Sequence, residues 1–186
     1  MTIPTILFLL ILIYAVVTYN SLTRKRNDVE NAFGAIDAML KKRYDLIPNI
    51  VATVQQYAAH EKETLAEITG LRARNYSSLT DGEKAEFDRS FTAASRNLFA
   101  VAENYPQLRA SENFMQLQRS LNETEEQLSA ARRTYNAAVT EYNNTVMSVP
   151  SNIIANIFSF TKKEVLTIPE AERATPDVKK LFQSQD

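Results

Sequence analysis

Residues 6–17 read ILFLLILIYAVV, a stretch that is apolar apart from the hydroxyl of Tyr14. It lies within residues 1–23, which carry no charged side chain. At about 1.5 Å per residue, a helix over residues 3–22 is about 30 Å long, and this length crosses the hydrocarbon core of a bilayer. The stretch lacks the preceding basic residues and the following cleavage site of a secretory signal peptide. The sequence therefore predicts an uncleaved, single-pass transmembrane anchor over residues 1–23.

Three basic residues, Arg24, Lys25 and Arg26, follow this anchor directly, whereas only the terminal amine precedes it. Short basic segments next to a span stay on the cytoplasmic side of a membrane. We therefore expect the rest of the chain to lie in the cytoplasm.

Beyond the anchor the chain has the spacing of long helices. Apolar side chains recur every three or four residues from Val29 to Ile68, which is the period of one helix face. Only Pro48 interrupts this stripe, because proline lacks the amide hydrogen of a helix interior and clashes with the preceding turn. The pattern allows two solutions. One is a tight turn between antiparallel helices, with Asp45 as a cap, and the other is a long helix that kinks at Pro48.

Two further helices are predicted downstream. Thr80-Asp81-Gly82-Glu83 has the Thr-x-x-Glu spacing of a capping box, so a helix begins near Asp81. Asn104-Tyr105-Pro106 ends it, since proline suits the first turn of the helix that follows, and that last helix ends before Pro150. The predicted apolar seam of the earlier helix comprises Phe87, Phe91, Ala94, Leu98, Val101 and Tyr105.

Residues 150–186 form a tail without long periodicity, and its apolar cluster comprises Ile153, Ile154, Ile157, Phe158 and Phe160. If the chain turns near Asp45, it forms four helices that run alternately away from and toward the membrane. The fourth helix then ends near the bilayer and brings this cluster there, with Lys162 and Lys163 beside anionic headgroups. If the helix continues through Pro48, three directions remain and the cluster lies at the far end of the helical domain. In either topology the cluster can instead cover the end of the core. The predicted division is an anchor (1–23), a helical domain (24–149) and a tail (150–186).

The composition excludes several classes of chemistry. With no cysteine, one histidine and three glycines among 186 residues, the chain lacks the residues of disulfides, thiolate metal sites and glycine-rich phosphate loops. A net charge of -1 provides no field that attracts nucleic acid. We expect an all-α protein that binds no cofactor, metal ion or nucleic acid.

Two motifs begin like catalytic sites and are incomplete. His60-Glu61 starts the His-Glu-x-x-His motif of zinc proteases, but Thr64 occupies the position of the second histidine. A di-iron carboxylate bundle also needs a second histidine. The acidic residues of the last helix fall mostly on its solvated face, and they are Glu123, Glu125 and Glu126. We therefore predict no catalytic, cofactor-binding or metal-binding residue and no enzyme.

Two other polar groups allow a structural or a binding role. Lys41-Lys42-Arg43 lies just before Pro48, where it either complements a helix C-terminus or forms a docking patch for an acidic partner. Tyr135-Asn136 and Tyr142-Asn143 repeat at an interval of seven residues. This interval predicts tyrosines in a helix seam and asparagines that set the helix register.

The order of these motifs resembles the bacterial LemA family from the anchor to about Phe160. The motifs that carry the resemblance are Tyr19-Asn20, Arg26-Asn27, Ile36-Asp37, KRYDLIPN at 42–49, YAAHE at 57–61, Asn104-Tyr105-Pro106, ARRTYN at 131–136 and Tyr142-Asn143. The sequence departs from the family at Phe33-Gly34, where many members have tryptophan, and at Ser159-Phe160, where glycine often precedes the phenylalanine.

This resemblance implies a single-pass protein of the bacterial inner membrane with an up-and-down antiparallel four-helix bundle of long helices, and it favours the turn at Pro48. It implies no established reaction. We expect a membrane-tethered scaffold or adaptor of the cell envelope, surrounded by membrane lipid, whose exposed helix faces recruit other membrane proteins or further copies of the chain. The alternative is an accessory or substrate-presenting subunit of a membrane enzyme such as a membrane protease.

Overall fold

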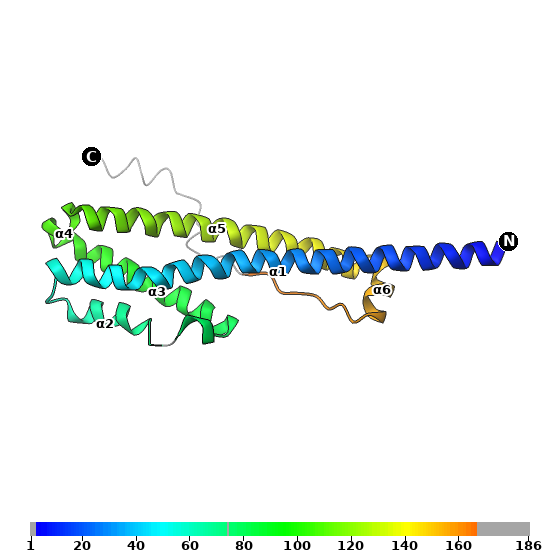
Figure 1. The fold of residues 1–186 in the computed structure, drawn as a ribbon, viewed down its shortest axis with the longest axis horizontal. Coiled ribbons are helices and arrows are strands. Elements are labelled where there is room, and N and C mark those ends of the chain that lie inside the picture. Colours follow the sequence, from blue (N-terminus) through cyan, green and yellow to red (C-terminus); the bar gives the residue numbers. More distant parts are fainter. Residues whose placement is uncertain (1–2, 74, 167–186) are drawn as a thin grey trace, which may run out of the picture. The chain divides into compact units, whose positions relative to one another are not determined.

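The computed structural model describes residues 3–73 and 75–166, and every regular element in these residues is helical (Figure 1). The α-helices are α1 (Ile3–Tyr57), α2 (Lys62–Gly70), α3 (Asp81–Glu103), α4 (Pro106–Ala110), α5 (Glu112–Met147) and α6 (Ser151–Ile157), and a short 3-10 helix covers Tyr76–Ser78. The predicted all-α class is confirmed. The part of the predicted tail beyond Leu166 lies outside the described residues, and the predicted division at residues 23 and 149 stays a prediction.

The turn at Pro48 that the family resemblance favoured is wrong, because α1 continues through this proline to Tyr57. The apolar stripe keeps its phase across Pro48, and Ile47, Ile50 and Val54 are each no more than 1% exposed. A proline inside a helix costs about 3 kcal/mol, whereas burying each of these side chains contributes roughly 1.5–3 kcal/mol. Keeping the stripe on one continuous face therefore outweighs the lost backbone hydrogen bond.

The chain first reverses where α1 ends. The Glu61 amide donates to the Ala58 carbonyl at 3.1 Å, and the Lys62 amide donates to the His60 carbonyl at 2.9 Å. α2 and α3 then pack against each other in opposite directions (Figure 1). The reversal expected at Pro48 thus occurs later in the chain, between α1 and α2.

The start of α3 is as predicted. The Glu83 amide donates to the Thr80 hydroxyl at 3.3 Å, and the Thr80 amide donates to the Glu83 carboxylate at 2.8 Å. These bonds form the predicted capping box and satisfy two backbone amides at the helix start. The predicted seam is buried at Phe87, Phe91, Ala94 and Leu98.

Residues 30–133 form one of two compact units, and its core contains a cluster of aromatic rings. The centroids of Tyr44 and Tyr76 lie 5.6 Å apart. The Tyr76 hydroxyl donates to the Asp37 carboxylate at 2.8 Å, and Lys84 pairs with the same carboxylate at 2.7 Å. Burial alone would raise the pKa of Asp37, but the hydrogen bonds from Lys84 and Tyr76 bring this pKa below its ordinary value. These contacts fix the segment before α3 against α1.

A buried ionic cluster joins α1, α3 and α5 within the same unit. Asp88 of α3 accepts hydrogen bonds from Arg43 of α1 and from Arg132 of α5. Arg43 also pairs with Glu125 of α5, and the Arg43 side chain is only 3% exposed. One arginine of α1 thus contacts both of the other long helices through carboxylates.

Each cation of the basic run Lys41-Lys42-Arg43 lies near a carboxylate of the same unit. Lys41 pairs with Asp45 one helical turn later, and the Lys42 amine lies 3.8 Å from the Glu123 carboxylate. Because α1 does not end here, the interpretation of these charges as partners of a helix C-terminus is wrong, and the docking patch stays a prediction. Burial of Arg43 removes the last charge of the run from solvent.

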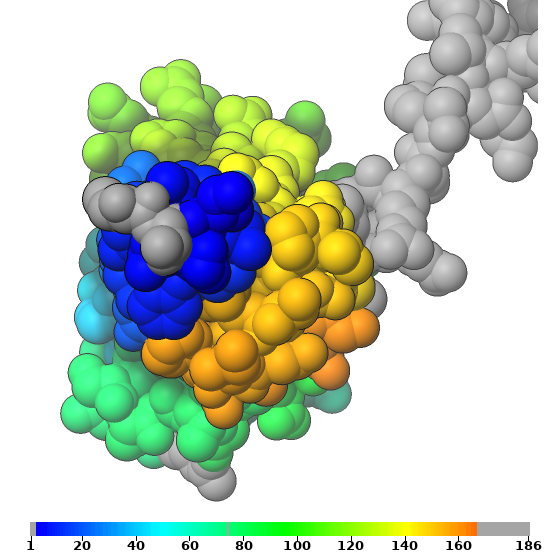
Figure 2. All heavy atoms as spheres, turned by 90° about the vertical axis from the view of Figure 1, so that its right-hand side faces the viewer, coloured from blue at the N-terminus to red at the C-terminus, as the bar shows by residue number. Residues whose placement is uncertain are grey.

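The other compact unit consists of the described parts of residues 1–29 and 134–186. The early part of α1, the end of α5 and the region of α6 meet in its core, which comprises Leu22, Val29, Val139, Tyr142, Ile154, Ala155 and Phe160. Figure 2 shows the start of α1, in blue, directly beside the yellow and orange atoms of the end of α5 and of residues 150–166. The candidate functional site lies in this unit.

Candidate membrane-proximal site

The first turns of α1 are apolar and exposed. Nearly every side chain of residues 3–17 faces outward, and Phe8 and Ile11 are 66% and 59% exposed. Among the described helices, α1 is the one long and apolar enough to cross a membrane. A core helix of a water-soluble domain would bury such side chains, and this segment does not. Its surface therefore fits lipid better than a protein interior.

Contacts with the core of this unit begin at the partly buried Ala15, and the first buried position of α1 is Thr18. This residue is 7% exposed and Leu22 is fully buried, while Lys25 pairs with Glu141 of α5. The exposed apolar part of α1, residues 3–17, is about 22 Å long, which is shorter than a hydrocarbon core of roughly 30 Å. A bilayer around α1 would therefore extend to the level at which α1 packs against the rest of its unit.

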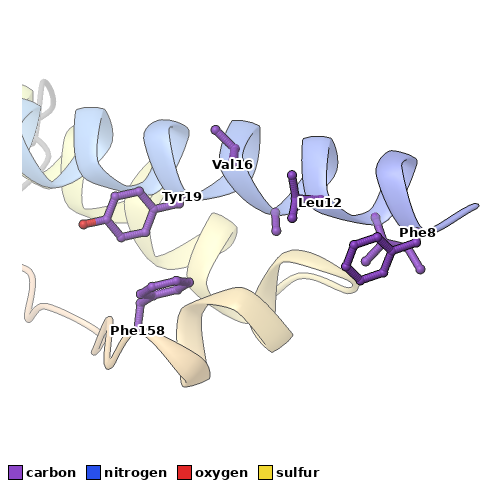
Figure 3. Close-up of a pocket in the computed structure, with 7 residues that line it drawn as sticks. Phe8, Leu12, Val16, Tyr19 and Phe158 are labelled. Carbon is purple, nitrogen blue, oxygen red and sulfur yellow. The ribbon is translucent and has the colours of Figure 1, made fainter. Parts of the chain in front are cut away.

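An apolar hollow of about 400 Å³ lies between α1 and the residue that follows α6 (Figure 3). Figure 3 shows Phe8, Leu12, Val16 and Tyr19 along α1, with Phe158 facing Tyr19 from the other side. Ile11 and Ala15 complete the lining, which is apolar apart from the tyrosine hydroxyl. The hollow has the chemistry to take hydrocarbon and lacks the convergent polar groups that orient a polar substrate.

Next to this hollow, further along α1, lie aromatic rings and then a cation. The Tyr19 ring lies edge-on to Phe158 and Phe160, with centroid distances of 4.8 and 5.7 Å. The Arg26 guanidinium lies 5.3 Å from the centroid of Phe160. From Tyr19 to Arg26, α1 rises by about 10 Å. Apolar, then aromatic, then cationic side chains along a helix are typical of a segment that leaves a bilayer through its interface.

The helix α6 has apolar side chains on both its buried and its exposed sides. It buries Ile154 and Ala155 in the core of the unit, whereas Ile153, Ile157 and the following Phe158 are 57%, 66% and 53% exposed. The apolar cluster predicted in the tail thus both covers the core and faces outward.

The position of α6 corrects one sequence-based expectation. A helix that continues through Pro48 was expected to leave this cluster at the far end of the helical domain. The structure instead packs Ile154 and Ala155 with Leu22, next to the apolar segment of α1. A continuous α1 removes the reversal expected at Pro48, but the chain reverses between α1 and α2 instead. The number of reversals is therefore unchanged.

The two tyrosines of the Tyr-Asn pairs of α5 pack in or against the core of this unit, as the sequence predicted, whereas the two asparagines bond to a non-helical segment instead of setting the register between helices. Tyr142 is 1% exposed, and its hydroxyl donates to the Thr161 carbonyl at 2.9 Å. Burial raises the pKa of Tyr142, although Arg26 opposes the shift. Asn136 and Asn143 bond to the non-helical residues 161–166. The heptad interval identified these side chains but not their partner.

The residues that resembled catalytic motifs are not assembled into a site. In residues 30–133, His60 is exposed in the turn after α1, and Glu61 accepts a hydrogen bond from the Tyr105 hydroxyl at 2.8 Å. This bond raises the pKa of Tyr105. Within the described residues, no three His, Cys, Asp or Glu side chains are grouped so as to hold a metal ion. Of the acidic residues of α5 considered above, Glu125 pairs with Arg43, while Glu123 and Glu126 are exposed.

Comparison with known proteins finds a family model and several relatives that match this chain. The sequence model of the LemA family matches residues 32–179. The chain is 27% identical to Protein LemA of Metamycoplasma hominis over 165 residues, which cover 87% of this chain and 74% of that protein. It is 25% identical over 172 residues to Magnetosome protein MamQ 2 of Paramagnetospirillum magneticum and 21% identical over 172 residues to Magnetosome protein MamQ of Magnetospirillum gryphiswaldense. Each of these two alignments covers 78% of this chain and 63% of the relative.

Proposed function

The chain belongs to the LemA family, and from this membership and the geometry of α1 we propose that it is a membrane-anchored helical scaffold or adaptor of the bacterial cell envelope without catalytic activity of its own. In this proposal α1 crosses the inner membrane once, and the long helices form an up-and-down antiparallel four-helix bundle on the cytoplasmic side. Its partners are membrane lipid, other membrane proteins and further copies of the chain.

One observation carries the proposal: the exposed apolar segment and the packed segment that follows it belong to a single helix, α1. The chain stays helical from Val17 to Leu22, where exposed apolar side chains give way to buried ones. A flexible linker would let a tethered domain sample many distances from the membrane, whereas a helix fixes that distance. Anchoring also raises the effective concentration of any partner in the same membrane. Both effects suit a scaffold.

The exposed face of α6 supports a second contact with the membrane. Residues 3–17 account for only about 22 Å of a hydrocarbon core of roughly 30 Å, so the bilayer would reach α6. Ile157 and Phe158 would then enter the interfacial layer, with Lys162 beside anionic headgroups. Lipid hydrocarbon would fill the hollow between α1 and Phe158.

Co-purification in a mild detergent, followed by mass spectrometry, tests the scaffold role. We expect the tagged full chain to return further copies of itself together with several membrane proteins in small amounts. A single membrane enzyme at fixed stoichiometry would contradict the scaffold and support an accessory subunit.

A cysteine at position 86 tests the orientation in the membrane. The chain has no cysteine, and Glu86 is exposed on α3, whereas the neighbouring Glu83 takes part in the capping box. We expect Glu86→Cys to resist a membrane-impermeant maleimide in intact cells and to react after lysis, because the basic residues after the anchor favour the cytoplasmic side. Fast labelling in intact cells would place the helical domain outside the cytoplasm.

A spin label at Ile157→Cys tests the membrane contact of α6. We expect lipid-soluble oxygen to relax this label several times faster than a label at the matched control Glu126→Cys, because oxygen concentrates in hydrocarbon and Glu126 is an exposed residue of α5. Ser159 is a poor labelling position, since its φ of 56° lies in the left-handed region. Equal relaxation at the two positions in reconstituted bilayers would leave α6 with the role of covering the core only.

A further inference from the structure

Two asparagines of α5 hold the main chain of residues 161–166 in the same way. The Asn143 side-chain amide donates to the Lys163 carbonyl at 2.8 Å and accepts from the Lys163 amide at 2.9 Å. The Asn136 side-chain amide donates to the Leu166 carbonyl at 2.9 Å and accepts from the Leu166 amide at 2.8 Å. Each asparagine thus satisfies both backbone groups of one residue, as a paired β-strand does. We call residues 161–166 the strap and these two asparagines the clamp asparagines.

The spacing of the clamp matches the geometry of the two chains. The clamp asparagines are seven residues apart, which is about 10.5 Å along a helix. The strap residues that they hold are three apart, which is about 9–10 Å in a polyproline II or extended chain. The two repeats therefore stay in register.

The hydrogen bonds that Tyr135, Asn136, Tyr142 and Asn143 make to the strap all go to its backbone. Tyr142 donates to the Thr161 carbonyl at 2.9 Å, and Tyr135 donates to the Glu164 carbonyl at 3.3 Å. Among the strap side chains, only those at the two clamped positions are partly buried, and Val165 is 53% exposed. A segment that served only to cover the core would turn its apolar side chains inward. This one presents its main chain instead.

From this geometry we infer that the α5 face formed by Tyr135, Asn136, Tyr142 and Asn143 is a binding site for an extended polypeptide backbone, that the chain's own strap occupies it here, and that it also accepts the strap of a second copy of the chain. A second copy carries the same backbone groups at the same spacing. Exchange of straps links two copies without any new contact, and a shared membrane raises their effective concentration. This inference goes beyond the scaffold role, and its test requires no membrane.

Proline substitutions test the clamp within one chain. Leu166→Pro removes the amide hydrogen that Asn136 accepts, while Val165→Pro is the matched control, because no acceptor faces its amide within the described residues. Trypsin cleavage after Lys162 in the full chain in detergent, measured by mass spectrometry, reports release of the strap. We expect cleavage about tenfold faster than wild type in Leu166→Pro and in Asn136→Ala, since proteolysis follows the population of the open form. Val165→Pro should be cleaved at the wild-type rate, and equal rates for the two proline variants would overturn the clamp.

A peptide tests acceptance of a second strap. The probe is a fluorescent, capped peptide of residues 161–166, and the receptor is the full chain in detergent carrying Lys163→Pro and Leu166→Pro, whose own strap cannot be clamped. We expect the probe to bind this receptor in fluorescence anisotropy, and to bind about tenfold more weakly once Asn136→Ala and Asn143→Ala are added. A probe with the same two prolines is the matched control and should not bind. No binding to the first receptor, or equal binding to both receptors, would overturn the exchange of straps.

Discussion

Replacing Asp88 with alanine is expected to lower the free energy of unfolding by about 3–5 kcal/mol. Asp88 is 8% exposed and accepts hydrogen bonds from both Arg43 and Arg132. Its removal leaves two guanidinium groups facing each other in the interior without the carboxylate between them. Arg43 keeps Glu125, but that side chain is 44% exposed and its charge is largely solvated. Chemical denaturation of the full chain in detergent measures the loss.

Companion variants separate charge from packing at this cluster. Asp88→Asn keeps the shape of the side chain and removes its charge, so a loss close to that of the alanine variant assigns the effect to charge. The triple variant Arg43→Met, Asp88→Leu, Arg132→Met should recover most of the stability, because apolar side chains often replace a buried ionic triad at no net cost. The exposed pair of Lys41 and Asp45 provides the control, and Asp45→Ala should cost less than about 1 kcal/mol. An Asp88→Ala loss as small as that would contradict the buried cluster.

Features that depend on a few neighbouring residues were predictable from the sequence. The apolar segment before Thr18, the helical class and the capping box of Thr80 and Glu83 each follow from a local pattern, and the structure contains all three. The seam of α3 was predictable for the same reason, since its period reports which face is buried. Local pattern and tertiary structure agree at these positions.

At Pro48, tertiary packing outweighs the local preference of proline to end a helix. Proline argues for a break, yet the buried residues on both sides of it keep one phase and the helix continues. The basic run just before this proline could not be interpreted from local pattern either, because its charges can complement a helix C-terminus only if a helix ends there. Only the contact of Arg43 with Asp88, forty-five residues away, shows that the charge belongs to the interior.

The clamp was beyond sequence reasoning for a different reason. A heptad interval of tyrosine and asparagine on a helix usually means contact with another helix, and nothing periodic marks residues 161–166 as their partner. The clamp asparagines bond to main-chain groups, and every residue has these groups except that proline lacks the N–H, so these bonds leave no pattern in the sequence of the strap. The one available clue was that seven residues of helix and three residues of extended chain have nearly the same length.

Replacing Phe91 with alanine is expected to cost about 3–5 kcal/mol of unfolding free energy. Phe91 is 3% exposed on α3, and its ring centroid lies 5.8 Å from that of Phe87. The Arg43 guanidinium lies 5.5 Å from the same centroid, so the substitution removes apolar burial and a cation–π contact together. The neighbouring ionic cluster restricts how far the backbone can relax into the cavity, which favours the upper part of this range.

Two further substitutions on α3 make the Phe91 measurement specific. Phe91→Leu keeps most of the side-chain volume and should cost less than about 1.5 kcal/mol of unfolding free energy. The reason is that most of the loss expected for Phe91→Ala comes from the cavity and not from the loss of an aromatic ring. Phe99→Ala is the matched control, because Phe99 is only partly buried and its ring contacts Phe114 at a centroid distance of 6.1 Å. It should therefore cost clearly less than Phe91→Ala under the same denaturant series. If Phe91→Ala shifts the unfolding free energy by less than about 1 kcal/mol while Phe99→Ala shifts it more, the buried face of α3 is the opposite one.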